Sequence, residues 1–142
     1  MIKFTPKKIH LILFFYFFIF SANSNNNFFN EGVVLFKSKN LEESKIKFEK
    51  DIVFNPKSEK SYLYLAKIFK KKKKLLLQEN SLNTVLLLNP KNEEAIYLLA
   101  LLSIERSNFS KTKILIENLD SFCVSFCSKV DELEKELENS LK

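Results

Sequence analysis

Apolar residues form three patterns along this chain. A continuous apolar run covers Ile9 to Phe20, a second set of apolar positions repeats every 34 residues between residues 25 and 124, and a stripe at helical spacing follows near the C-terminus. The stripe predicts a final amphipathic helix with one apolar and one polar face; its apolar positions are Phe126, Val130, Leu133, Leu137 and Leu141. On its polar face we expect Glu132, Lys135 and Glu136 to point outward.

Two Asn-Pro-Lys segments set the period of the middle pattern, because they begin at Asn55 and Asn89, 34 residues apart. A proline excludes the helical conformation for the residue before it, so a helix must end at each of these asparagines. Side chains that can cap the N-termini of the following helices stand at matching places, namely Asn40, Ser58, Asn92 and Asn108. The middle of the chain therefore reads as helices separated by short, regularly spaced linkers.

Three sets of residues recur in register at this interval. They are Phe28, Glu31, Gly32, Leu35, Ser44 and Phe48; then Tyr62, Leu65, Ala66, Phe69, Gln78 and Leu82; then Ile96, Leu99, Ala100, Ser103, Thr112 and Ile116. These sets fall on the W-x-x-L-G-x-x-Y and A-x-x-x-F patterns of the tetratricopeptide repeat, so residues 25 to 124 resemble a short protein of that family. The resemblance implies an all-α, right-handed solenoid of antiparallel helix pairs.

The resemblance also divides the chain. It implies about three repeats, over residues 25–58, 59–92 and 93–119, followed by a capping helix over residues 120–142 that closes the stack. Gly32, Ala66 and Ala100 occupy the place where the two helices of one repeat approach most closely, which favours small side chains. The chain departs from the family pattern where Glu31 replaces an apolar residue and Asp51 replaces a small one.

The first 24 residues have the pattern of a secretory signal peptide. Lysines precede the apolar run, and Ala22 and Ser24 are small residues at the spacing that a signal peptidase reads. The run is shorter than the roughly 20 residues that span a membrane as a helix. We expect cleavage near Ser24 and export to the periplasm or the exterior; the alternative is an uncleaved segment that anchors the protein in the inner membrane.

Composition argues against catalysis. The chain contains 23 Lys and Arg against 17 Asp and Glu, and three of these lysines would leave with the signal peptide, so the excess of positive charge becomes small. The only histidine, His10, would leave as well, and Gly32 is the only glycine. Without a histidine base or ligand and without a glycine-rich phosphate loop, we expect no enzyme, no cofactor and no metal site. Catalysis by glutamates alone is a remote alternative.

Cys123 and Cys127 lie four residues apart in a segment that we expect to be helical. A bridge at this spacing would strain a helix, so we interpret both as small apolar residues that cover the third repeat. The alternative is a disulfide, which an oxidising compartment allows.

An unbroken lysine run lies between the two helices of the second repeat, and it consists of Lys70, Lys71, Lys72, Lys73 and Lys74. We interpret it as a solvated turn between helices. The functional alternative is contact with an anionic surface, such as lipid headgroups or an acidic partner. Nucleic acid is not an expected partner, because no aromatic residue is interleaved with the lysines.

In tetratricopeptide-repeat proteins the first helices of successive repeats line a concave groove. The resemblance places Phe29, Val33, Phe36, Leu63, Lys67, Tyr97, Leu101 and Ile104 there. This predicts an apolar and aromatic groove with a basic middle. The family's carboxylate clamp is not matched, because Phe29 and Val33 stand where it needs polar groups. The same residues could instead be covered by the terminal helix or by a second copy of the protein.

The sequence therefore predicts a non-enzymatic interaction module or scaffold of the cell envelope. Its expected partner is another protein, held as a peptide or helix in the groove. Self-association and contact with a membrane surface are further possibilities. The alternative function is a membrane-anchored structural subunit of an envelope complex, held by an uncleaved N-terminal helix.

Overall fold

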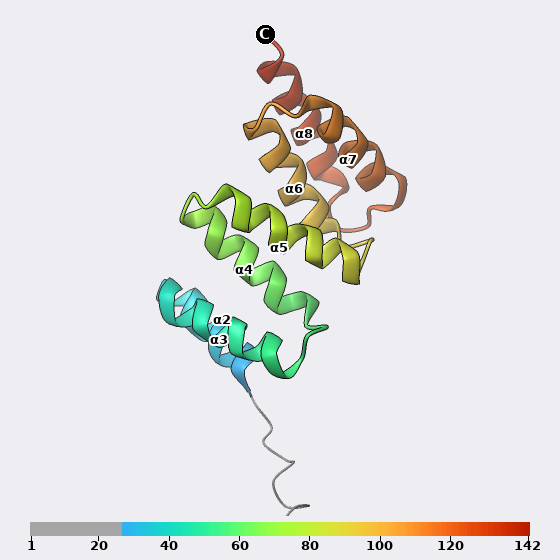
Figure 1. The fold of residues 1–142 in the computed structure, drawn as a ribbon. Helices are drawn as coiled ribbons and strands as arrows, with labels where there is room; N and C mark the ends of the chain where they lie inside the picture. The colour runs from blue at the N-terminus through green and yellow to red at the C-terminus, as the bar shows by residue number, and fades with distance from the viewer. Residues whose placement is uncertain (1–26) are drawn as a thin grey trace, which may run out of the picture.

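A computed structural model describes residues 27–142 of the chain (Figure 1). The predicted signal segment, with Ala22 and Ser24, lies outside the described residues. The described part consists of α-helices without strands. The helices are α2 (Phe28–Lys37), α3 (Leu41–Phe54), α4 (Glu59–Lys71), α5 (Leu75–Leu88), α6 (Glu93–Glu105), α7 (Phe109–Phe122) and α8 (Cys127–Ser140).

The helices pair along the chain as α2 with α3, α4 with α5, and α6 with α7, and each pair packs on the next. The last helix, α8, contacts both α6 and α7 and so closes the stack (Figure 1). The expectation of an all-α solenoid of helix pairs with a C-terminal capping helix is confirmed.

The ends of the helices repeat at the same interval of 34 residues. Second helices end at Phe54, Leu88 and Phe122, which are successive positions at that interval. The third of these has no proline after it, so its end has another cause, described below. The turn inside each pair repeats as well, since Lys39, Lys73 and Ser107 have φ values of 63°, 53° and 55°.

These three residues adopt the left-handed conformation that commonly ends a helix. After each of them, the next backbone N–H donates to a carbonyl five residues earlier: Asn40 to Leu35 at 2.9 Å, Lys74 to Phe69 at 2.9 Å, and Asn108 to Ser103 at 2.8 Å. One turn geometry therefore joins the helices of all three pairs.

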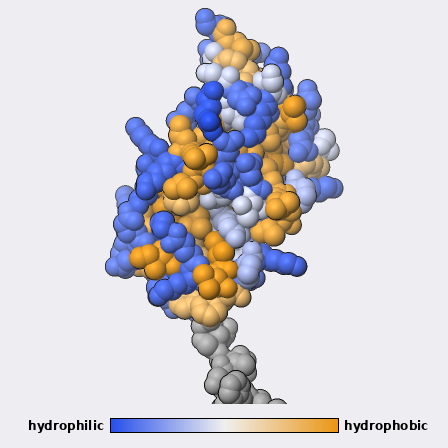
Figure 2. Space-filling model, viewed as in Figure 1, coloured by the Kyte–Doolittle hydropathy of each residue, from blue (hydrophilic) through white to orange (hydrophobic). Residues whose placement is uncertain are grey.

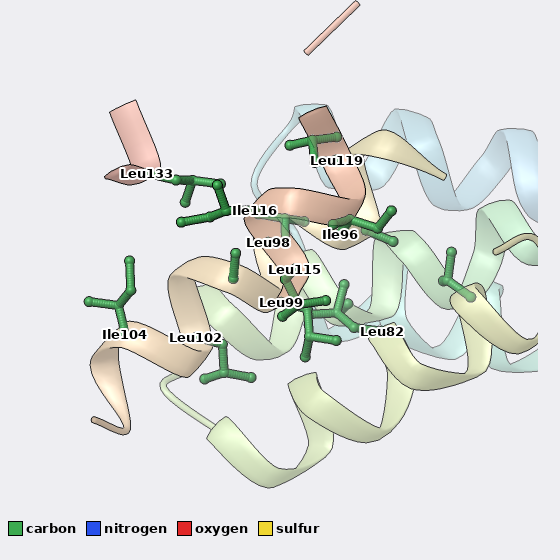
Figure 3. Close-up of a cluster of buried hydrophobic side chains, with 14 of the residues drawn as sticks. Leu82, Ile96, Leu98, Leu99, Leu102, Ile104, Leu115, Ile116, Leu119 and Leu133 are labelled. Atoms are coloured by element: carbon green, nitrogen blue, oxygen red, sulfur yellow. The ribbon is translucent and has the colours of Figure 1, made fainter. Parts of the chain in front are cut away.

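The buried apolar side chains form two clusters. The larger one lies between the second repeat, the third repeat and α8, and Figure 3 shows Leu82, Leu99, Leu115 and Leu133 among its members. The smaller one joins the first repeat to α4 and consists of Phe48, Leu65, Ile68 and Phe69, with half-buried residues packed around it. Repeat one is thus attached to the stack through a core of its own.

Small residues stand where the helices of a pair approach most closely. Gly32 is buried, and a Cβ atom placed on it would lie 2.7 Å from Cε1 of the fully buried Phe48 ring. Ala66 and Ala100, at the same place in the next repeats, are 1% and 0% exposed. This burial agrees with the small side chains expected at these positions.

The unusual Asp51 has a structural role. Its side chain is buried, and its Oδ2 accepts hydrogen bonds from the hydroxyls of Ser58 and Ser61, each at 2.5 Å. Asp51 therefore ties the end of α3 to the start of α4. The Ser58 side chain points toward Asp51 and makes no capping bond, and of the four expected caps only Asn92 and Asn108 accept a backbone N–H.

The expectation for the cysteines was wrong. Cys123 and Cys127 form a disulfide, with their Cα atoms 5.3 Å apart. Helix α7 ends at Phe122 and α8 begins at Cys127, so the bridge closes a loop between two helices and does not lie inside one. The structure thus gives the alternative that the sequence left open.

A carboxylate from another helix explains why the chain leaves the helical conformation here. The side chain of Glu93, at the start of α6, accepts hydrogen bonds from the backbone N–H groups of Val124, Ser125 and Phe126 at 3.0, 2.8 and 2.8 Å. Partial burial raises the pKa of Glu93, but these three donors lower it more, so its pKa lies below the ordinary value. The loop is therefore held against α6 by a charged acceptor.

Candidate partner-binding surface

The predicted groove residues of the first repeat surround an aromatic side chain of the second. Phe29 and Phe36 of α2 meet the ring of Tyr64 edge-on, with centroids 5.8 and 5.2 Å away, and Tyr64 stacks on Phe48 at 4.9 Å. Phe29, Val33 and Phe36 are half-buried. Tyr64 was not among the predicted groove residues, although it directly follows one of them in the sequence.

The middle of the surface carries a balanced charge. Lys67 of α4 forms an ion pair with Glu94 of α6, with 2.7 Å between Nζ and Oε1, and its ammonium lies 4.8 Å from the centre of the Tyr64 ring. The expected basic middle is therefore paired with a carboxylate. Leu63 is 8% exposed and belongs to the core, so we do not keep it as a contact residue.

The third part of the surface lies on α6. Tyr97 is half-buried, packs on Phe126 with ring centroids 5.7 Å apart, and donates a hydrogen bond to Oε1 of Glu132 at 2.7 Å. Burial, with the hydrogen bond and charge of Glu132 and the charge of Glu136, raises the pKa of Tyr97 to about 12. Its hydroxyl thus stays protonated at physiological pH. Ile104 is 7% exposed and, like Leu63, is not kept.

A pocket of about 440 Å³ opens beside Tyr97, between α6 and α8. Tyr97 and Leu101 supply its apolar wall, and its polar wall consists of Lys70, Gln78, Glu105, Glu132 and Glu136. Two of these carboxylates come from α8, whose polar face we expected to point outward. The capping helix therefore turns part of its acidic face toward the first-helix surface, which the sequence did not indicate.

The lysine run is divided between different surroundings. Lys70 and Lys71 belong to the last turn of α4, and the other three form the turn before α5. Lys70 lines the pocket, the Lys71 ammonium lies 5.7 Å from the centre of the Phe36 ring, and Lys72 pairs with Glu42. These lysines do not gather into one free cationic cluster.

Within residues 27–142, no group of three or more His, Cys, Asp or Glu side chains could hold a metal ion. A second pocket, of about 390 Å³, includes Asp51 and Glu59. Both carboxylates are used by the fold, since Asp51 binds the two serines and Glu59 accepts from the amides of Asn89 and Asn92. Among the described helices, none is long and apolar enough to cross a membrane.

Apolar side chains also lie on the outer surface. Figure 2 shows hydrophobic residues between hydrophilic ones on one face of the molecule. Val53 and Leu87, at equivalent places in α3 and α5, are 75% and 82% exposed. Leu87, an exposed residue of a second helix, provides a control position for the first-helix surface.

Comparison with known proteins gives the fold. No protein-family model matches the chain, and no curated protein matches it. A solved tetratricopeptide repeat protein from Parabacteroides merdae ATCC 43184 aligns over 84% of this chain, with a TM-score of 0.75 and 19% identity; this chain spans 47% of it.

Two smaller domains are similar as well. The first TPR of Spaghetti, bound to the HSP90 peptide SRMEEVD, has a TM-score of 0.72 and 16% identity, with 81% of this chain and 91% of that one covered. The TPR2B domain of yeast Sti1, in complex with pHsp70, has a TM-score of 0.70 and 15% identity, with 77% and 91% covered. The described part of this chain therefore has the fold of tetratricopeptide-repeat proteins.

Proposed function

We propose that this protein is a non-enzymatic interaction module that binds a segment of another protein along the first helices α2, α4, α6 and the capping helix α8. The observation that carries the proposal is the set of half-buried apolar side chains on α2 and α6, namely Phe29, Val33, Phe36, Tyr97 and Leu101. Aromatic and large aliphatic side chains that are fixed in place and still reachable are typical anchors of protein interfaces.

The similar solved structures support a peptide partner, because the Spaghetti domain is bound to an HSP90 peptide and the yeast domain is in complex with pHsp70. The residues of this chain argue for a partner segment of a different kind. Phe29 and Val33 are apolar, and Lys67 is already paired with Glu94 at 2.7 Å. A segment with apolar anchors fits this surface better than one that ends in free carboxylates.

We place this module in the cell envelope, outside the cytoplasmic membrane. The proposal is supported by the lysines and apolar run of residues 1–24 and by the disulfide between Cys123 and Cys127, since disulfides persist in oxidising compartments. The alternative, a subunit anchored by an uncleaved N-terminal helix, shares the binding surface and differs only in attachment.

The experiment is a capture assay from native envelope extract with purified protein and three variants. The double change Tyr97→Ala and Leu101→Ala removes anchors, and we expect it to weaken capture at every salt concentration. Glutamine at Lys71, Lys72, Lys73 and Lys74 should weaken capture mainly at low salt, because salt screens exposed charges. Leu87→Ala removes an apolar side chain outside the surface and should leave capture unchanged.

Circular dichroism establishes that each variant is folded before the comparison is made. Normal capture by the folded Tyr97 and Leu101 variant, together with loss of capture in the glutamine variant, would contradict the proposal and make the lysine turn the binding site.

A further inference from the structure

The pocket between α6 and α8 contains carboxylates that the fold does not use. Glu132 is engaged, since it accepts from Tyr97 at 2.7 Å and from Lys129 at 2.5 Å. Glu105 and Glu136 line the same pocket, and neither carboxylate forms an ion pair with another of the described residues. Two negative charges thus face this pocket from α6 and α8, and neither is paired with a cationic side chain of residues 27–142.

The inner wall of the pocket includes a buried side-chain amide. Gln78 of α5 is 2% exposed and lines the pocket, and its Oε1 is buried without a hydrogen-bond partner in the described part of the chain. An unpaired buried acceptor is unfavourable, and buried polar groups in native proteins almost always have a partner. Because this oxygen is closed off from solvent, a ligand that carries N–H groups into the pocket would supply the missing donor once the amide turns toward it.

The charge of the pocket selects a cation. Lys129 pairs with Glu132 and lies 5.7 Å from the centre of the Tyr97 ring, so the negative charge of the pocket comes from Glu105 and Glu136. These two carboxylates outnumber the single lysine of the wall, Lys70, which is exposed. The raised pKa of Tyr97 has burial as its first cause, with Glu132 and Glu136 adding to it. The wall formed by Tyr97 and Leu101 can pack on an apolar stem or a flat group, while the carboxylates hold its charged end.

We propose that this pocket receives an arginine side chain of the protein partner. The inference rests on the proposed function and names one residue type that the partner segment carries. A guanidinium is planar, has several N–H donors in a fixed arrangement, and stacks on aromatic rings. It can therefore stack on Tyr97, donate to Gln78 and contact the carboxylates of Glu105 and Glu136. An ammonium is more compact and offers no flat face to the ring.

The test uses a small probe and not the partner. The protein is titrated with N-acetyl-arginine methylamide while NMR follows the Tyr97 ring and the side-chain amide of Gln78. The matched probes are the citrulline analogue, which has nearly the same shape without the charge, and the lysine analogue. We expect the arginine probe to cause saturable chemical-shift changes at Tyr97 and Gln78, and the other two probes to cause much smaller changes.

Three variants assign the contacts. Glu105→Gln and Glu136→Gln should each weaken binding of the arginine probe by about fivefold, which corresponds to about 1 kcal/mol for one charge pair. Gln78→Met keeps the size of the side chain and removes the acceptor, so it should weaken binding too. Glu138→Gln, on α8 but outside the pocket wall, is the control and should have no effect.

Several results would overturn the inference. The citrulline probe would bind as tightly as the arginine probe, or the lysine probe would bind more tightly than it. Glu138→Gln would change the chemical shifts as much as Glu136→Gln does, or the arginine probe would cause no saturable chemical-shift change at tens of millimolar concentration. Each leaves the proposed function standing, because capture through Tyr97 and Leu101 is measured separately. If the arginine probe binds and the Tyr97 and Leu101 variant still captures partners normally, the proposed function fails and the pocket remains.

Discussion

The contact between Gly32 and Phe48 allows a quantitative test of the repeat packing. A Cβ atom on Gly32 would lie 2.7, 2.9 and 3.0 Å from Cε1, Cδ1 and Cζ of the Phe48 ring. Carbon atoms in ordinary contact are about 3.5–4.0 Å apart, so Gly32→Ala requires a movement of roughly 1 Å. The ring is fully buried between Phe29 and Tyr64 and cannot move without disturbing them.

The magnitude follows from two opposing effects. Overpacking of a core costs about 1–3 kcal/mol, whereas alanine in place of glycine inside a helix gains about 1 kcal/mol. We therefore expect Gly32→Ala to lower the free energy of unfolding by about 1 kcal/mol, and Gly32→Leu by more. Urea denaturation followed by circular dichroism measures this difference.

The other repeats show which second change should compensate. In the second repeat, Ala66 stands at the position of Gly32 and Leu82 stands at the position of Phe48. We expect Phe48→Leu, which removes the ring atoms nearest the new Cβ, to make Gly32→Ala tolerable. In a double-mutant cycle the two changes should be coupled by about 1 kcal/mol or more. Ala66→Gly, the reverse change in repeat two, should be destabilising. Strict additivity of Gly32→Ala and Phe48→Leu would refute the packing argument.

Four further results are expected. Glu93→Gln should lower the melting temperature. Because the pKa of Glu93 is depressed, the stability that its carboxylate contributes should be present at neutral pH and lost as the pH falls through that pKa. A variant that melts at the same temperature as the wild type would contradict the role of the carboxylate. Reduction of the Cys123–Cys127 disulfide should cost up to about 2 kcal/mol by loop-closure entropy, and free thiols in the untreated protein would show that the bond is absent. Lys73→Gly should raise the free energy of unfolding by about 0.5–1 kcal/mol in urea, because glycine adopts positive φ without steric cost; a decrease would contradict it. Mass spectrometry of native protein should find an N-terminus within a few residues after Ser24, whereas intact chains in the membrane fraction would favour the anchored alternative.

The sequence predicted the period of the fold, and its residues explain why. Proline after Asn55 and Asn89 ends two helices by local sterics, and small residues at Gly32, Ala66 and Ala100 report close helix contacts. These are signals within single repeats, so they can be read without knowing how the repeats pack on one another. The fold class followed from the resemblance to the repeat family that these positions carry, and the capping helix followed from the apolar stripe near the C-terminus.

Features that depend on contacts between distant residues were not predicted. The end of α7 depends on the carboxylate of Glu93, about 31 residues earlier in the chain, and the missing cap at Ser58 depends on Asp51. In both cases a side chain was used by a partner that only the folded chain brings near. The disulfide differs from the expectation for the same reason, because its segment lies between two helices and not inside one.

The candidate surface was predicted only in part. The first-helix positions were placed by the repeat pattern, but burial removed Leu63 and Ile104 from it. Glu132 and Glu136 are exposed as expected, but the sequence did not indicate that they also line a pocket. Their orientation depends on how α8 packs against α6, and the helical period of α8 alone cannot give that.

The division of the core into two clusters means that the stack need not open all at once. Repeat one is joined to the rest through a small cluster of four buried side chains, while α4 to α8 share the larger one. In repeat proteins each unit is stabilised by its neighbours, so the terminal unit with the smaller core is the first to unfold locally. If a pulling force acts on the N-terminal end, α2 and α3 can unfold while the pocket between α6 and α8 keeps its shape. The molecule then lengthens under load, and a side chain bound in this pocket stays in place although the contacts on α2 are lost.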